Sequence, residues 1–569
     1  MLNFKGVIGH TVNLKLEKSD HEIVYTTIYP TEAKSIYNIP GSRIITLEVS
    51  PSVNATIFFT SNEQHQSLQL INGSASFPLQ SSMSKNQYVV EAYTIVSVMF
   101  FLILWFLLEQ LSWSSSKRWP IYAGIFLLHS CFLGLLFWGS FPGFLGHDTF
   151  NNYSNALSYR PSSVFLGDLY SSIMIVLMQL IPKVWVTSLL NSLVILTCLT
   201  TLSTIAVRLN VIKFYFLGLC IFFLYPANSL ISFFGVRDIT SLWVFTTTIL
   251  LFYSSYITKD TSFKNVLGIT ICTIIACLTR QEAFIILLPG MIIISYLVHK
   301  TFLKPSLIIA SVSLLASLLT NIISVHPMEA ANYHATLIVN PLSYILKNKY
   351  PQGLPEQVNR DLGTYFKNEY LVQYQEDFEI LPFHKGGVNF LASQKDYNQF
   401  RSAAIMIILS NPWLFLKNRI NMAGYIFGFN TNWSFIYSDE YSFSPARSSE
   451  YIEDVKSELS VPKYSRPSWG FKMTSYSGRL IRQHPIVFAS YIIPLLLILG
   501  LFITRYASRF YALLCLILGA RIILVCLIAP AGYFKYQYPL WLFAPFSLFL
   551  LVAEKRRKLT NPPAPFTTL

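Results

Sequence analysis

Charged residues are scarce in this sequence. Only 12% of its 569 residues are Asp, Glu, Lys or Arg, whereas soluble domains average about 25%. The net charge is +14, but the basic residues are scattered through short segments between apolar runs. This distribution is typical of membrane topology and of contact with anionic headgroups, and nucleic acid is therefore not an expected partner. Little charge combined with repeated apolar runs of about 17 to 22 residues predicts a polytopic membrane protein.

Motifs for several kinds of chemistry are also missing. The chain has no Walker-type Gly-rich loop, which argues against ATP-driven work by this chain. All seven cysteines lie in apolar runs, which excludes a disulfide framework for the polar regions. No CxxC motif and no Cys/His spacing typical of a metal site is present. We therefore assign no metal ligands and no certain cofactor.

The apolar runs predict a mainly α fold, a polytopic transmembrane helical bundle of about eleven spans. Short β-like runs at 44–49, 55–60 and 67–71 predict a small β-rich domain before the first span. We predict four segments: this β-rich domain at 1–88, an N-terminal transmembrane module at 89–324, a mixed extracytoplasmic segment at 325–485, and C-terminal transmembrane helices with a basic cytoplasmic tail at 486–569. The predicted spans are about 90–111, 119–140, 185–206, 214–234, 239–257, 265–279, 283–299, 305–324, 486–503, 509–529 and 536–552.

Short loops rich in Lys and Arg predict which ends of the spans face the cytoplasm. These loops are 117–118, 208–213, 259–264, 300–304, 505–509 and 555–558. Placing all of them inside brings the remaining polar stretches together on the outer face: the loop after residue 140, then 234–238, 279–282, 325–485 and 532–538. The apolar run 168–181 is too short to span, so we predict a re-entrant or interfacial helix on the outer side. The N-terminal domain is predicted outside as well, with a cytoplasmic position as the alternative.

The outer segment 325–485 is too long to be a passive loop. It contains a helix-like run at 401–409 and a second apolar run at 414–429, which Lys417 and Arg419 interrupt. Charges at those positions suit a helix that lies in the membrane interface better than one that crosses it. The aromatic residues that crowd this region are also typical of a membrane surface. Membrane lipids are therefore expected partners.

The loop that follows the run at 119–140 carries the first candidate for chemistry. It turns at Pro142 and Gly143 and then presents His147 and Asp148 at the expected membrane boundary. Ionisable groups at such a boundary are costly to desolvate, so they are candidates for function. Asp148 offers a general base that accepts the proton of a positioned hydroxyl nucleophile, with His147 beside it in the substrate site.

Other charged residues are predicted at span boundaries on the same face. Arg237 and Asp238 form either a structural ion pair or a site in which the carboxylate binds a divalent cation or an acceptor hydroxyl. Arg280 lies at the tip of a tight hairpin, where its guanidinium group would suit a phosphate, although Glu282 could pair with it internally. Divalent-cation dependence stays open.

The start of the last span carries a further cation and a tyrosine, Lys535 and Tyr536. A cation and tyrosines at the outer edge of the membrane could hold a lipid phosphate. The alternative is an interfacial anchor of the kind that Lys and Tyr often form at a membrane surface.

The order of these features resembles the GT-C superfamily of polytopic glycosyltransferases. The resemblance covers about 119–552 and depends on Pro142, Gly143 and Asp148 in the first outer loop, followed by a short non-spanning helix. The acidic Asp238 and the Arg280 hairpin also match. The run from Asn411 to Leu416 with Arg419, and His484 with Pro485 entering a span, resemble bacterial members related to lipopolysaccharide, teichoic-acid or serotype-modifying transferases.

That resemblance implies a polyprenyl-phosphate sugar as donor and a catalytic first-loop Asp, here Asp148, with Asp238 as the second acidic residue. Two features depart from the superfamily pattern. His147 precedes Asp148, so the first loop has no Asp-Asp or Asp-Glu pair, which puts metal dependence in doubt. The first span and the N-terminal domain also lie outside the usual plan.

The resulting expectation is an integral-membrane glycosyltransferase in a bacterial inner membrane, with an active site facing the periplasm. It would move a hexose from a polyprenyl-phosphate donor to an extracytoplasmic glycan or lipid-linked acceptor of the cell envelope, such as lipopolysaccharide or O-antigen. Arg237, Arg280, Glu282, Lys535 and Tyr536 would bind substrate. Three alternatives stay open: an O-antigen polymerase or ligase, a transporter or flippase of lipid-linked sugar, and a non-enzymatic scaffold.

Overall fold

A computed structural model describes the chain in two compact units. One unit comprises Met1–Glu91, Asn155–Pro161 and His326–Asn421, and the other comprises Ala92–Ser154, Ser162–Val325 and Met422–Leu569. Within residues 2–78 the structure describes the backbone of seven strands. Beyond them it describes, with short gaps, residues 119–140, 168–350, 354–375, 393–429 and 491–560, and a few isolated positions elsewhere. The predicted first span, about 90–111, and the loop with His147 and Asp148 lie outside the described residues.

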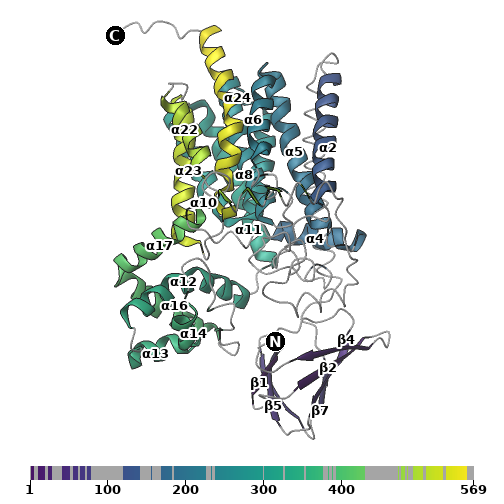
Figure 1. Ribbon diagram of the computed structural model, residues 1–569, viewed down its shortest axis with the longest axis vertical. Helices are drawn as coiled ribbons and strands as arrows, with labels where there is room; N and C mark the ends of the chain where they lie inside the picture. Colours follow the sequence, from purple (N-terminus) through teal and green to yellow (C-terminus); the bar gives the residue numbers. More distant parts are fainter. Residues whose placement is uncertain are drawn as a thin grey trace. The chain divides into compact units, whose positions relative to one another are not determined.

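Seven strands form two antiparallel sheets at the start of the chain (Figure 1). One sheet has the order β1-β5-β6 and the other has the order β3-β2-β4-β7. In the second sheet Leu14 of β2 lies opposite Leu47 of β4. The strands are β1 (Leu2–Lys5), β2 (Thr11–Lys18), β3 (Ile23–Ile28), β4 (Ser42–Ser50), β5 (Ala55–Ser61), β6 (Gln64–Leu70) and β7 (Ser74–Pro78). The predicted domain boundary at residue 88 and the side of the membrane on which this domain lies stay predictions.

The second unit is a helical bundle. Its elements are α2 (Trp119–Ser140), α4 (Asp168–Leu180), α5 (Val186–Arg208), α6 (Ile212–Leu224), α8 (Arg237–Thr258), α9 (Phe263–Thr279), α10 (Gln281–Val298), η2 (Lys300–Phe302), α11 (Leu303–Ser324), α22 (Ile492–Ile503), α23 (Arg509–Ile528), η4 (Phe534–Gln537) and α24 (Tyr538–Thr560). Five stretches of helix among the described residues are long and apolar enough to cross a membrane: Trp119–Ser140, Val186–Arg208, Lys300–Leu319, Arg509–Ile528 and Tyr538–Lys558.

The outer helices of this bundle expose apolar side chains that a soluble protein would cover. Leu127 and Trp138 of α2 and Leu315 of α11 are all exposed. Exposed apolar faces of this length are stable only in contact with lipid. The chain is therefore an integral membrane protein.

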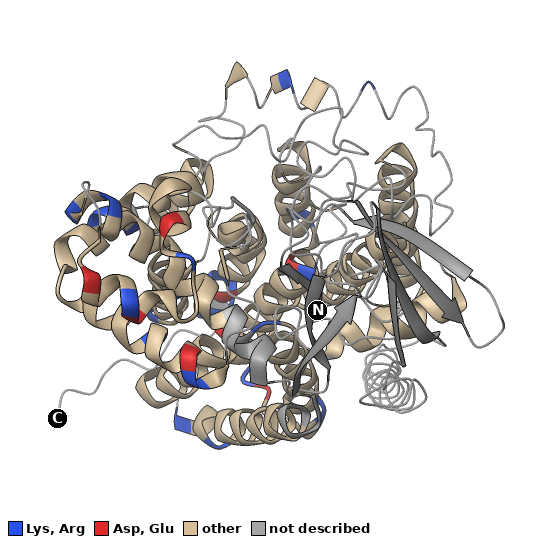
Figure 2. Ribbon diagram, turned by 90° about the horizontal axis from the view of Figure 1, so that it is seen from below, with Lys and Arg blue, Asp and Glu red and all other residues tan. Residues whose placement is uncertain are grey.

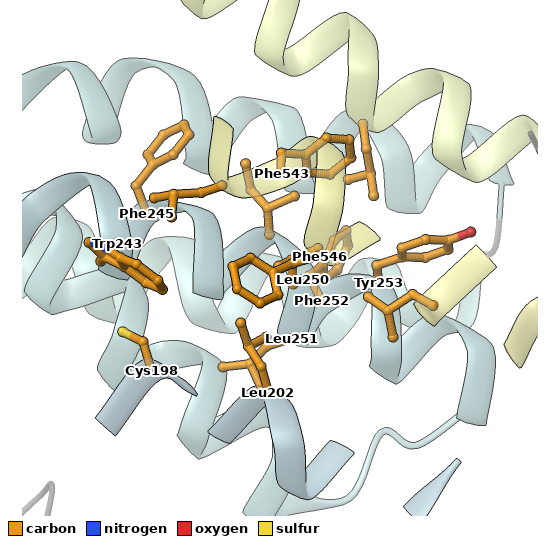
Figure 3. Close-up of a cluster of buried hydrophobic side chains, with 14 of the residues drawn as sticks. Cys198, Leu202, Trp243, Phe245, Leu250, Leu251, Phe252, Tyr253, Phe543 and Phe546 are labelled. Carbon is orange, nitrogen blue, oxygen red and sulfur yellow. The ribbon is translucent and has the colours of Figure 1, made fainter. Parts of the chain in front are cut away.

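The centre of the bundle is built on α8 and α24. Almost every side chain of α8 is buried, as expected for a helix that other helices surround. Trp243 and Phe252 of α8 and Phe546 of α24 belong to one hydrophobic cluster, to which α5 contributes Cys198 and Leu202 (Figure 3). This packing fixes the axial position of α8 and therefore of the charged residues at its first turn.

Two helices clarify the predicted boundaries. Within the span predicted at 214–234, helix α6 ends at Leu224, and most of residues 226–236 lie outside the described residues. Tyr225 is extended, with φ −80° and ψ 116°, and Pro226 follows it; a residue before proline disfavours helical geometry. The short helix predicted at 168–181 is present as α4, which has only 13 residues, while its sidedness stays a prediction.

The described helices of the first unit are α12 (Pro327–Lys349), α13 (Glu356–Gly363), α14 (Asn368–Gln373), α16 (Gln394–Leu409) and α17 (Pro412–Ile426), and the last of these continues into the second unit. A core that includes Leu342, Leu362, Tyr365 and Phe400 joins the first four. Burial in this core raises the pKa of the Tyr365 hydroxyl above its usual range. A capping box at Ser393 and Asp396 begins α16.

Candidate functional site

Four of the charged residues predicted at the outer face, Arg237, Asp238, Arg280 and Glu282, meet at one end of the bundle. Arg237 and Asp238 are the first residues of α8, and Arg280 separates the end of α9 from the start of α10. Arg280 is extended, with φ −150° and ψ 125°, so the chain turns sharply there. After a short turn, α9 runs antiparallel to α8. The end of α9 therefore lies beside the start of α8, where Asp238 is. Figure 2 views the ribbon from below and marks its acidic and basic residues among mostly uncharged helix.

Arg280 is held by two carboxylates. Its Nη1 donates a hydrogen bond to Oδ1 of Asp238 at 2.8 Å. Its Nε lies 2.9 Å from Oε1 of Glu282. The guanidinium carbon also lies 5.5 Å from the ring centroid of Tyr536, in a cation–π contact. Arg280 thus bridges α8 and α10 in one defined orientation.

Arg521 of α23 completes this network. Its Nη2 donates to Oε1 of Glu282 at 3.1 Å, and its Nη1 donates to the backbone carbonyl of Tyr536 at 2.7 Å. Its guanidinium lies 5.4 Å from the ring centroid of Phe245. Arg521 lies inside the span predicted at 509–529 and is not among the predicted site residues. Its isolation within that run was the available signal, because ionisable residues inside spans are rare and usually functional.

The part of the network that the structure describes contains more arginines than carboxylates. Arg237, whose Nη2 lies 3.6 Å from Oδ1 of Asp238, is the third cation. Among the described residues, three guanidinium groups thus accompany two carboxylates, and these five groups have a summed formal charge of +1. The Arg521 side chain is 1% exposed, and those of Arg280 and Asp238 are 11% and 10% exposed. Buried guanidinium groups of this kind are suited to binding an anion as well as to pairing within the protein.

The carboxylates of this site face cations. Asp238 lies next to the guanidinium groups of Arg237 and Arg280. Glu282 lies next to those of Arg280 and Arg521. Among the described residues, no group of three or more His, Cys, Asp or Glu side chains is placed to hold a metal ion. The contacts of Asp238 with Arg237 and Arg280 favour the ion-pair alternative predicted for it.

The remaining predicted residues are only partly described. Tyr536 lies in η4, and its ring and carbonyl both contact the network. Lys535 precedes it in η4, but its side chain lies outside the described residues. His147 and Asp148 lie outside them as well, so the predicted distance from Asp148 to Arg280 stays a prediction.

Comparisons with known proteins give one distant likeness. No family model matches the chain, and no curated protein matches it. Among solved structures, the crystal structure of ArnT from Cupriavidus metallidurans bound to undecaprenyl phosphate aligns with 78% of this chain and 79% of its own. The aligned residues are 13% identical, and the TM-score is 0.30.

Proposed function

We propose that this protein is an integral-membrane glycosyltransferase of the GT-C type, which transfers a sugar from a polyprenyl-phosphate donor to an extracytoplasmic acceptor. The acceptor would be a glycan or a lipid-linked glycan of a bacterial cell envelope, and the site would face the periplasm from the inner membrane. The observation that carries the proposal is the buried network of three arginines and two carboxylates found among the described residues.

A phosphate group is the anion that such a network fits best. Guanidinium groups match phosphate oxygens through paired N–H donors, which gives orientation as well as attraction. Arg280 is already oriented by Asp238 and Glu282, so its position need not reorganise when a ligand binds. The Nε of Arg237 has no hydrogen-bond partner among the described residues, and in this proposal it is the donor for a phosphate oxygen.

Each predicted residue then has a role. Arg237 and Arg280 bind the phosphate, the Tyr536 ring borders that site, and Lys535 is proposed as a further cation on the strength of its place next to Tyr536 in the sequence. Asp238 and Glu282 orient the arginines, so Asp238 acts as a positioning residue in this proposal rather than as a second catalytic acid. Asp148 is the general base, beside His147, on the strength of the sequence pattern.

The proposed reaction is a displacement at the anomeric carbon. Asp148 accepts the proton of the acceptor hydroxyl, and the hydroxyl oxygen forms a bond to the anomeric carbon. The bond between that carbon and the phosphate oxygen breaks, and its electron pair stays on the departing polyprenyl phosphate. The arginines would stabilise the negative charge that develops there, an effect worth roughly 10²–10³ in rate per donor in other enzymes.

The test is a complementation experiment read out by mass spectrometry of surface glycans. We expect deletion of the gene to remove one hexose-like unit and the wild-type gene to restore it. Asp148→Asn should not restore it, although the variant should accumulate in the membrane at the wild-type level. Asp260→Asn is the matched control, because Asp260 lies beyond the other end of α8, where it accepts a hydrogen bond from the backbone of Ser262.

Three outcomes would overturn the proposal. Full restoration by Asp148→Asn would remove the assigned base. Shortened glycan chains in the deletion strain, together with tolerance of Asp148→Asn, would identify a polymerase. Movement of labelled lipid-linked sugar across vesicles, without transfer to any acceptor, would identify a transporter.

A further inference from the structure

We infer that the outward faces of α16 and α17 form a surface that binds the headgroup region of an anionic lipid bilayer. This inference is independent of the proposed transfer reaction. The face is built from Ile405, Met406 and Leu409 of α16 and Trp413, Leu416 and Ile420 of α17, and is named the elbow face. All six side chains are exposed.

The spacing of these residues shows that they share one side of each helix. In α17, residues 413, 416, 417 and 420 follow the spacing i, i+3, i+4, i+7. In α16, residues 405, 406 and 409 follow the i+3, i+4 and i+7 part of the same pattern. Trp413 is 71% exposed and Leu409 is 69% exposed. An apolar stripe of this kind normally marks the side of a helix that is covered.

The protein's own core uses the opposite sides of the same helices. Phe400 and Ala404 of α16 are fully buried in a hydrophobic core with Leu342 and Tyr365. Met422 of α17 is also fully buried. The elbow face is thus a second apolar surface, which faces away from this core.

Buried polar contacts hold α17 in this orientation. The Arg419 side chain donates from Nη2 to Oδ1 of Asn340 on α12 at 2.8 Å, and its guanidinium lies 5.7 Å from the Phe415 ring. Between α16 and α17, the Asn411 side chain donates a hydrogen bond to the carbonyl of Ile407 at 2.7 Å. Rotation of α17 that buried Trp413 would break the contact between Arg419 and Asn340.

This geometry corrects one prediction from the sequence. Lys417 and Arg419 were both expected to be charges at the membrane interface. Only Lys417 is exposed, whereas Arg419 is 2% exposed and is hydrogen-bonded to other residues of the protein. Two residues apart on a helix, they point to different sides.

The charge of the segment favours anionic lipid over other occupants. Residues 401–429 contain Arg401, Lys417 and Arg419 and no acidic residue. Arg401 and Lys417 are exposed beside the apolar side chains. An apolar stripe flanked by basic residues is the composition of helices that lie in a membrane interface, where apolar burial and attraction to anionic headgroups act together.

The far end of α17 packs against a span. Met422 and Ile426 form a buried cluster with Val525 and Ala529, at the end of the membrane-crossing helix α23, and with Tyr536. The last turn of α17, which belongs to the second unit, is thus anchored at the end of a span.

The test uses full-length protein reconstituted in vesicles of equal parts phosphatidylcholine and phosphatidylglycerol. The emission of Trp413 is obtained as the difference between wild type and Trp413→Phe. With lipids brominated near the headgroup end of the acyl chain, we expect most of this emission to be lost, while aqueous iodide leaves it largely unchanged. The matched control is Trp243→Phe, because Trp243 is buried among α8, α6 and α24 and its difference emission should respond to neither quencher.

A second variant removes the apolar character of the face. Leu409→Glu combined with Ile420→Glu should shift the Trp413 emission to longer wavelength and make it accessible to iodide, without a change in the Trp243 signal. Iodide quenching of Trp413 in the wild type, with no effect of brominated lipid, would overturn the inference. Shielding of Trp413 that depends on the number of protein copies per vesicle would overturn it in favour of a contact between copies of this chain.

Discussion

At the scale of single residues, the arginines of the network are distinguished by how many groups each one joins. Arg280 joins Asp238, Glu282 and the ring of Tyr536, and Arg521 joins Glu282 to the chain at Tyr536. Charges so deeply buried are tolerated because the guanidinium groups of Arg280 and Arg521 each have several partners, while removal of one partner would leave another charge uncompensated. Arginine suits this task because its N–H groups point in fixed, divergent directions.

We predict that Arg280→Lys weakens binding of polyprenyl phosphate by at least about tenfold, which corresponds to about 1.4 kcal/mol. Lysine keeps the positive charge, but one ammonium group cannot reproduce the separate contacts of Nη1 with Asp238 and of Nε with Glu282. The measurement is a titration of purified protein in detergent with polyprenyl phosphate, followed by native mass spectrometry.

Arg360→Lys is the control for this substitution. Arg360 and Glu356 form an exposed pair on α13 at 3.3 Å, and such pairs contribute only about 0.3–0.5 kcal/mol. We expect unchanged binding in this variant. If Arg280→Lys also binds polyprenyl phosphate as the wild type does, the network is a structural ion cluster and not a phosphate site.

At the scale of elements, the approach of α6 to α24 depends on one glycine. A Cβ atom at Gly218 of α6 would lie 2.5 Å from the carbonyl oxygen of Pro545 in α24. Small residues at helix contacts are typical of membrane bundles, in which packing replaces the hydrophobic effect between helices. Because α24 also packs against α8, this contact helps to position the helix that begins at Arg237.

We predict that Gly218→Ala destabilises the protein by about 1–3 kcal/mol, because the backbone of α24 must move to admit a methyl group. Gly124→Ala is the matched control: Gly124 lies in α2, has no atom within 4 Å of an added Cβ, and should tolerate alanine or gain slightly. Thermal unfolding in detergent measures both variants. Equal unfolding temperatures for the two would contradict a tight contact between α6 and α24.

At the scale of the whole molecule, the basic loops predict the orientation in the membrane. We predict that Thr261→Cys, in the turn between α8 and α9, reacts with a membrane-impermeant maleimide only after cells are permeabilised. Glu356→Cys, on α13 of the outer segment, should react in intact cells. Both positions are exposed, so a difference in labelling reports the side of the membrane. The reverse pattern would place the arginine network on the cytoplasmic side and remove the periplasmic site.

Much of the architecture could be predicted because a membrane imposes simple rules. An apolar run must form a helix of spanning length, since no water is available to its backbone groups. This rule predicts α2, α5 and α23 to within a few residues. It does not predict the end of α6 at Leu224, inside the run 214–234, because the mean polarity of a run does not show where a helix is interrupted.

Charge rules predict which residues share a face of the membrane, but not which atoms meet. The sequence places Asp238 and Arg280 on one side, and the structure joins them at 2.8 Å. Arg521 was not assigned to the site, because its position inside an apolar run gives no information about its neighbours. Its contact with Glu282 exists only because α23 packs beside α10.

The sequence alone therefore determined the class of this protein. Exposing so many long apolar runs to water would cost too much free energy, and in lipid such runs must form helices to satisfy their backbone groups. It also determined the end of the bundle at which the charged side chains of α8 and α10 gather. Only the tertiary structure decided how those charges pair, that Arg419 is internal while Lys417 is exposed, and that Arg521 completes the network. Helical periodicity shows which residues share a face, but the packing of other helices decides which face is covered.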